Sequence, residues 1–434
     1  MERKIDPTLQ YEQSEITNSS YSHSKIVPLS GQQTITVTPD SGVDTTWELP
    51  VQSYNLSRSY IYAKVSIPAN AKAHFYHTGC LPFSSVQIFT RTGNYMLNLQ
   101  ENAHKYSRVC LTADSTAEQL EHGSSENPFY VAGEDKALVG GKGSAGSVGA
   151  KYREQAYLKT AAPGALEFTL QIPLSALKNT ICDIDRSILM GEIVVMKIKW
   201  ARGKDISFLA TAETDPDSGV ADQAENITYS EVGLYLAIER SAAVVEALQA
   251  QISSESGFSI LCPFPTVYTN SIQASTRQNI SLRLNKSNAS ALKSIKHTVF
   301  GQTTNNLFFD RDNAGGSKVE KYYSNINNQR LQEQTIDVKN NDDDWWYLKK
   351  RYQNTSVYNN AIHKLNWMHE DNFVDYADRF RDGEVDRSAY GGLDLNSELR
   401  VDIYYETANT AFDHFTIVDG IKVLNVNNRG IVLV

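Results

Sequence analysis

The chain has 434 residues, of which 41% are apolar and 10% aromatic, and this is enough for the hydrophobic cores of two or three domains. Its 41 Lys and Arg residues against 50 Asp and Glu residues give a net charge of −9 with no basic block at either terminus, which argues against direct, sequence-specific nucleic-acid binding. The polar N-terminus lacks the apolar core of a secretory signal and no run of about 18 apolar residues occurs, so we expect an intracellular protein with no transmembrane segment.

Alternating apolar and polar residues recur along the chain, and a period of two lines one face of a β-strand with apolar side chains. In chain order, this alternation predicts strands at residues 60–68, 165–173, 192–200, 226–239 and 398–406. In the first of these segments the alternating residues are Ile61, Ala63, Val65 and Ile67. Strands therefore dominate both halves of the chain.

Three segments have the features of helices. Residues 241–257 place apolar side chains at helical spacing after Ser241, a residue type favoured at N-caps, and before Gly257, a residue type that commonly ends helices. The other two candidates are residues 101–123 and 342–368. Many strands and few short helices predict an all-β fold of sandwiches, in which the helix after residue 241 joins two β-domains of similar size.

Motifs for catalysis or cofactor binding are incomplete. The glycine-rich stretch at residues 140–151 has Gly143 where a phosphate-binding loop needs Ser or Thr, so we interpret it as a surface loop. Residues 310–321 end on Lys321 where a calcium loop needs Glu, and the spacing of His74 and His77 sends them to opposite faces of a strand. We therefore expect no enzyme activity, no cofactor and no metal site.

The four cysteines, Cys80, Cys110, Cys182 and Cys262, are spread widely along the chain. This spacing suits neither a disulfide-dense scaffold nor a zinc site. We expect buried, reduced thiols.

The segment Asp342–Tyr352, with sequence DDDWWYLKKRY, concentrates acidic, aromatic and basic residues. One interpretation is a helix whose charges match its dipole and whose tryptophans pack on a sandwich. The other is a binding stripe for a sugar, a nucleic acid or a protein partner, because Trp and Arg are prominent in interfaces. A subunit contact that contains the tryptophan pair would satisfy both interpretations. The candidate contact residues are Trp345, Trp346, Tyr347 and Arg351.

A resemblance to a known family rests on the order of several segments. Residues 80–119 form a strand, a tight turn at 92–94, a second strand and a helical stretch, and residues 166–200 run from an apolar strand through Ile172-Pro173-Leu174 to a further strand. The second half continues with residues 279–295 and ends in two strands at 398–406 and 421–434. Over residues 25–434, this order resembles the double jelly-roll major capsid proteins of the adenovirus, Polinton and virophage lineage.

The resemblance implies two tandem jelly rolls, each made of two four-stranded sheets. The expected divisions are a polar N-terminal arm at residues 1–24, a first jelly roll at 25–240, a connecting helix at 241–256 and a second jelly roll at 257–434. It also implies a homotrimer that forms a pseudo-hexagonal capsomer, tiles an icosahedral shell in the virion, and contacts minor capsid or penton proteins.

Two other classes remain open at this point. A β-sandwich carbohydrate-binding or adhesin protein would explain the tryptophan pair and the seven Asn-x-Ser/Thr sequons, one of them at Asn55, but it needs an export signal. A β-rich glycosidase would need two carboxylates that face each other across a cleft, and sequence alone does not pair them.

Overall fold

The structure is a computed structural model, and it describes most of the strands of the chain. The described residues are 20–67, 73–75, 81–93, 95–114, 166–210, 220–222, 224–254, 257–273, 277–285, 289–301, 319–331, 334–337, 368–372, 393–395, 398–407, 411–427 and 430–433.

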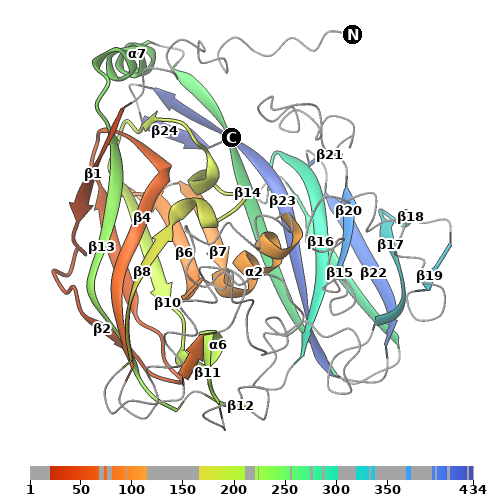
Figure 1. Cartoon of the computed structure of the whole chain (residues 1–434). Coiled ribbons are helices and arrows are strands. Elements are labelled where there is room, and N and C mark those ends of the chain that lie inside the picture. Colours follow the sequence, from red (N-terminus) through yellow and green to blue (C-terminus); the bar gives the residue numbers. More distant parts are fainter. Residues whose placement is uncertain are drawn as a thin grey trace.

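The first half of the chain folds into a β-sandwich, at the left of Figure 1. One sheet has the order β1-β13-β4-β8, in which β2 also pairs with β13 and β9 also pairs with β4. The other sheet has the order β3-β10-β6-β7. A small sheet has the order β12-β11-β5. The strands are β1 (Tyr21–Ile26), β2 (Ile35–Val37), β3 (Asp44–Leu49), β4 (Ser53–Ile67), β5 (Ala73–Phe75), β6 (Phe83–Thr90), β7 (Met96–Glu101), β8 (Leu166–Pro173), β9 (Ile188–Leu189), β10 (Val194–Trp200), β11 (Ser207–Ala210), β12 (Val220–Asp222) and β13 (Ile227–Glu239).

The second half forms another antiparallel sandwich beside the first (Figure 1). One sheet has the order β14-β23-β16-β20, with β21 and β24 added, and the other has the order β15-β22-β17-β18, with β19 added. The strands are β14 (Phe258–Ile272), β15 (Arg277–Leu284), β16 (Ala291–Gly301), β17 (Val319–Ile326), β18 (Gln329–Arg330), β19 (Ile336–Asp337), β20 (Met368–Asn372), β21 (Leu393–Asp394), β22 (Leu399–Thr407), β23 (Phe412–Asn427) and β24 (Gly430–Leu433).

All five strands predicted from alternation are confirmed, as β4, β8, β10, β13 and β22. The expectation of two four-stranded sheets in each sandwich is wrong, because several sheets carry extra short strands. The long strand β13 pairs with β1 over residues 234–239 and with β2 over residues 227–229. A long strand therefore extends past the end of each neighbour. A short strand pairs with the remaining part, so that the backbone N–H and C=O groups there are also hydrogen-bonded.

Tryptophan rings fill the first core. Trp47 and Trp200 are both 0% exposed, and the Trp200 indole N–H donates to Thr45 Oγ1 at 3.0 Å. The Trp200 ring also lies 5.1 Å from the Phe83 ring and 4.2 Å from the Tyr229 ring. The Trp200 indole thus has both apolar contact and a hydrogen-bond partner, and its contacts join β3, β6, β10 and β13.

Helices occur at two of the three predicted places. Residues Ala103–Asp114 form α2, and residues Ala242–Ser253 form α7 at the top of Figure 1. The third candidate, residues 342–368, lies outside the described residues except for Met368, which begins β20. The short helical turns are α6 (Gly203–Ile206), η3 (Leu174–Ala176) and η4 (Ile181–Asp183). No helix in the described part of the chain is long and apolar enough to cross a membrane.

Gly257 lies beyond the end of α7, which stops at Ser253, so it does not end the helix as predicted. It adopts a φ of +62°, and a Cβ on it would lie 2.2 Å from the Val426 carbonyl oxygen. Only glycine fits this left-handed conformation and this close approach. Gly257 thus allows β14 to begin directly against β23.

The two sandwiches share one hydrophobic core at the end where β14 begins. Five residues of the second half pack in the first core, namely Phe258, Cys262, Leu424, Val426 and Ile431. At their other ends the same long strands β14 and β23 reach the second core, which contains Phe412 and Val418. The ribbon of β14 and β23 therefore contributes side chains to both cores.

Further contacts join the halves along their flanks. The Lys105 ammonium of α2 lies 3.7 Å from the Asp413 carboxylate of β23, and the Asn102 amide donates to Thr269 Oγ1 at 3.3 Å. Cys110, Cys182 and Cys262 are buried free thiols, as expected for three of the four cysteines. Burial raises the pKa of both the Cys182 and the Cys262 thiols to about 12, so neither is a reactive nucleophile.

We expect Leu424→Ala to destabilise the whole chain. Leu424 is 0% exposed in the first core although it belongs to β23, and truncation of a buried leucine costs about 3 kcal/mol. Calorimetry of the variant should show a single unfolding transition at a lower temperature. Leu282→Ala, which truncates a side chain of the second core, should shift that same transition. Two separate transitions, of which each substitution moves only one, would show that the shared β14–β23 ribbon does not couple the two cores.

Candidate functional site: the polar cluster at strand β1

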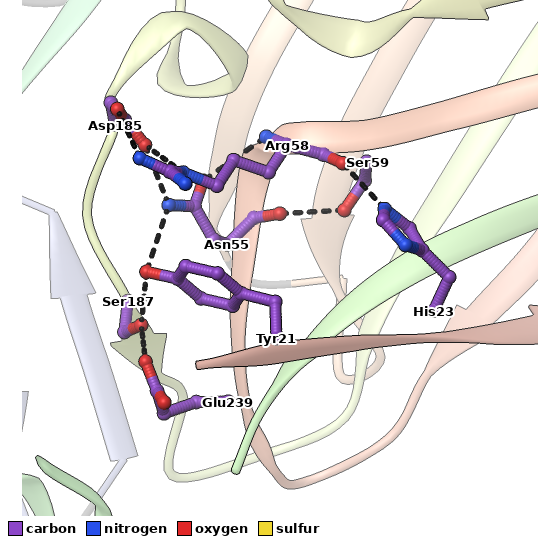
Figure 2. Close-up of polar contacts among 8 residues, drawn as sticks. All are labelled: Tyr21, His23, Asn55, Arg58, Ser59, Asp185, Ser187 and Glu239. Atoms are coloured by element: carbon purple, nitrogen blue, oxygen red, sulfur yellow. Dashed lines mark hydrogen bonds and ion pairs between the residues drawn. The ribbon is translucent and has the colours of Figure 1, made fainter. Parts of the chain in front are cut away.

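Eight polar and aromatic side chains gather where the first strand enters the sandwich, as Figure 2 shows. They come from β1, from the first residues of β4, from the segment before β9 and from the end of β13. The residues are Tyr21, His23, Asn55, Arg58, Ser59, Asp185, Ser187 and Glu239. β9 pairs with Ser53 and Tyr54 of β4, and this pairing brings the segment at 185–187 next to the cluster.

A bulge in β4 positions two of these side chains. Asn55 pairs with Ala237 and Tyr60 pairs with Tyr235, so residues 56–59 lie opposite a single residue of β13. The Ser59 hydroxyl closes the bulge, because it donates to the Asn55 carbonyl at 2.6 Å and accepts the Ala237 N–H at 3.0 Å. A bulge redirects side chains, and this one turns Asn55 and Arg58 toward the segment at 185–187.

The Glu239 carboxylate anchors the cluster and is only 4% exposed. Its Oε1 accepts backbone N–H groups from Ser20 at 3.0 Å, Arg240 at 3.0 Å and Ser241 at 2.8 Å. Its Oε2 accepts the Ser187 hydroxyl at 2.7 Å. A buried carboxylate needs such donors, and hydrogen bonds to a charged group are the strong ones. Glu239 therefore ties together the start of β1, the end of β13 and the segment before β9.

Glu239 also contacts the start of α7. Ser241 occupies the N-cap position of α7 as predicted, but its side chain accepts no hydrogen bond there. The Glu239 carboxylate accepts the backbone N–H of Ser241 itself. A negative charge near the N-terminus of a helix also interacts favourably with the helix dipole.

A chain of hydrogen bonds leads from Asn55 into this carboxylate. The Asn55 amide donates to the Tyr21 hydroxyl at 3.3 Å, and the Tyr21 and Ser187 oxygens are 3.0 Å apart. Because Ser187 donates its hydrogen to Glu239, Tyr21 is the donor to Ser187. The second amide hydrogen of Asn55 goes to Asp185 at 2.9 Å. Asn55 is 0% exposed, so its sequon cannot carry a glycan in this fold.

Arg58 and Asp185 close the cluster on the solvent side. The guanidinium donates from Nε to Oδ1 at 2.8 Å and from a terminal nitrogen to Oδ2 at 3.1 Å. This pairing lowers the pKa of the Asp185 carboxyl, and the Asn55 amide adds to the effect. Arg58 also lies over the Tyr21 ring at 5.1 Å. Both charged side chains are about half exposed, so the pair adds little stability.

Aromatic side chains continue from the cluster across the outer face of the sheet. His23 lies 5.3 Å from Tyr60, Tyr60 stacks on Tyr235 at 4.9 Å, and Tyr62 meets Tyr235 edge-on at 5.9 Å. Burial, followed by the neighbouring tyrosines, raises the pKa of the Tyr60 hydroxyl. The strip packs β1, β13 and β4 together on the side away from the core.

The chemistry of the cluster is that of a structural anchor. Ser187 is the candidate nucleophile beside a carboxylate, but it is 5% exposed and its oxygen already contacts the Tyr21 hydroxyl. Within the described residues, no group of three or more His, Cys, Asp and Glu side chains is placed to hold a metal ion. The geometry holds the first strand in place.

Most of the residues singled out from sequence are not among the described residues. Trp345, Trp346, Tyr347 and Arg351 fall outside the described residues, as do residues 140–151 and His77. His74 is part of β5. Sequence reasoning missed the cluster itself, and the available signal was the polar start of β4, SYNLSRS, just ahead of a clean alternating pattern.

Comparison with solved structures identifies the architecture. A quasi-atomic model of the PBCV-1 virus capsid matches with a TM-score of 0.55 and 9% identity, covering 100% of this chain and 98% of that chain. The chain has the double jelly-roll fold. The mavirus major capsid protein matches with a TM-score of 0.51 and 10% identity, covering 100% of this chain and 96% of that one. The Faustovirus major capsid protein matches with a TM-score of 0.53 and 8% identity, covering 94% and 91%.

At these identities the similarity concerns the fold. No protein-family model and no curated protein sequence matches the chain. The double jelly roll is thus retained here with sequence identities of 8–10% to the three capsid structures. Strand order and burial pattern carry the likeness, whereas individual side chains such as those of the β1 cluster have to be interpreted from their own contacts.

We expect Glu239→Gln to destabilise the first sandwich by about 2 kcal/mol, because a neutral amide loses charge-assisted hydrogen bonds and turns an N–H group toward buried donors. Chemical denaturation measures the loss, and hydrogen exchange should speed up at the Ser20 and Ser241 amides. Glu231→Gln is the matched control on the same strand, since Glu231 pairs with Lys64 at about half exposure and should cost less than about 1 kcal/mol. Equal losses in the two variants would refute the anchoring role.

Proposed function

We propose that the protein is a viral major capsid protein, a structural subunit without enzymatic activity, and that it resides in the capsid of the virion. The observation that carries this proposal is the extent of the fold match. The alignment spans 100% of this chain and 98% of the PBCV-1 capsid chain. A fold shared from end to end supports the same kind of structural role by analogy.

The rigid pairing of the sandwiches supports an assembly role. We propose that residues 1–24 are an N-terminal arm, 25–240 the first jelly roll, 241–256 the connecting helix and 257–434 the second jelly roll. Three copies of such a two-sandwich chain form a ring of six similar units, which tiles a hexagonal lattice with one protein. The partners are therefore copies of the same chain, followed by minor capsid or penton proteins. The net charge of −9 argues against direct contact with the genome.

We expect the purified protein to be a trimer. Light scattering should give three times the chain mass of 48.4 kDa, and negative-stain images should show ring-shaped particles. The physical reason is that sandwiches arranged in a ring must cover their flanks against the next copy. A stable monomer at micromolar concentration, in both low and high salt, would overturn the capsid proposal and favour a sugar-binding sandwich.

We place one subunit contact at Trp345, Trp346, Tyr347 and Arg351, because aromatic residues and Arg are enriched in protein interfaces. Replacing Trp345 and Trp346 together with Ala should weaken trimer formation at least tenfold while the sheet signal in circular dichroism stays unchanged. The described tryptophans, Trp47 and Trp200, provide the contrast, because they are fully buried in the first core. Trp47→Ala should lower the sheet signal and the unfolding temperature. A trimer unaffected by the double substitution would remove this contact.

A further inference from the structure

Two histidines lie side by side inside the second sandwich. His297 of β16 and His414 of β23 are both 0% exposed, and their ring centroids are 5.3 Å apart. In the register of these strands, His297 is opposite Thr416 and His414 is opposite Val299. Alternation along each strand places both imidazoles on the face that carries the core residues Ile295, Val299, Phe412 and Val418.

The Thr416 hydroxyl links the two rings. Its Oγ1 lies 3.3 Å from His297 Nδ1 and 3.3 Å from His414 Nδ1. A hydroxyl has one hydrogen and two lone pairs, so it donates to at most one ring nitrogen and accepts an N–H from one ring or from both. The bridge therefore fits two neutral imidazoles. Protonation of both rings would place two positive charges about 5 Å apart in the core.

The pair lies among apolar and polar side chains. The register and the core packing place Tyr268, Asn270 and Tyr322 on this side of the sheet, and β20 pairs with β16 at this point. His369 is opposite His297, and Asp371 is opposite Ile295. The buried ion pair of Lys296 and Asp419, with 2.8 Å between Nζ and Oδ2, belongs to the alternate residues on the other face.

The pH dependence of stability follows from whether the folded or the unfolded chain binds protons more strongly. Burial lowers the pKa of His414 well below 6.5, and the neighbouring His297 lowers it further. An unfolded histidine has a pKa of about 6.5, so below that pH the unfolded chain binds more protons than the folded chain. Stability contributed by the neutral imidazole is thus complete above about pH 6.5 and is lost as the pH falls below it.

We propose that the His297–Thr416–His414 bridge is an acid-sensitive element that lets the second sandwich loosen when the pH falls below about 6.5. The inference stands without the capsid proposal, because it concerns the folding of one chain. His104 of α2 acts in the same direction in the first half, since burial lowers its pKa to about 4. Because every variant in the test keeps His104, its contribution to the pH dependence of stability is the same in all of them and cancels in the comparison.

The test measures the unfolding equilibrium of the full chain in denaturant, in the presence of EDTA, between pH 7.5 and 5.5. A buried neutral histidine raises the unfolding constant about tenfold for each pH unit below 6.5. His414→Gln keeps a hydrogen-bonding group but does not titrate, so its acid-induced rise should be about tenfold smaller than that of the wild type at pH 5.5. Val299→Ala, on the strand position opposite His414, should be destabilised equally at every pH and keep the wild-type slope.

A second variant and a local readout complete the experiment. His297→Gln tests the same bridge from the other strand if His414→Gln does not fold, and it too should flatten the slope. Hydrogen exchange of the wild type, corrected for the intrinsic effect of pH, should rise in β16 and in residues 412–419 of β23 at pH 5.5. Wild-type pH dependence in the histidine variants, or no added exchange in these strands, would overturn the proposal.

Discussion

The packing of the β14–β23 ribbon into both hydrophobic cores is the constraint on which the rest of the structure depends. β14 and β23 are 15 and 16 residues long, and they pair with each other over the full length of β14. One end of this ribbon contributes Phe258 and Leu424 to the first core, and the other end contributes Phe412 to the second. Buried apolar surface is the dominant favourable term in folding, so separating the halves would expose both cores at once.

Polar groups then determine how the edges attach to this interior. Glu239 lies at the end of β13, where the chain leaves the first sandwich for α7, and its carboxylate holds the start of β1 as well. Lys105 and Asp413 hold α2 against the second half. These contacts add little apolar burial, but they specify where the first strand and the connecting helix lie relative to the cores.

Much of the fold could be predicted from sequence because alternation is a local signal. Strand β4 is predicted by the alternation of Ile61, Ala63, Val65 and Ile67. All four side chains are buried in the first core. The β1 cluster could not be predicted, because Asn55, Asp185 and Glu239 meet only after strands far apart in sequence have paired. The same holds for Leu424, whose alternation indicates a strand but not which of two cores it enters. The Trp345 and Trp346 contact stays a prediction, since those residues lie outside the described part of the chain.

The placement of β24 has a consequence for synthesis on the ribosome. Ile431 packs in the first core, together with Leu424 and Val426, although most of that core is made from residues before 240. A nascent chain can form the early strands soon after they emerge, but their core stays incomplete until Ile431 has been translated. The first half of the chain is synthesised first, but its core is completed only after the second half has been made. Until then the growing chain exposes apolar surface that molecular chaperones would have to shield.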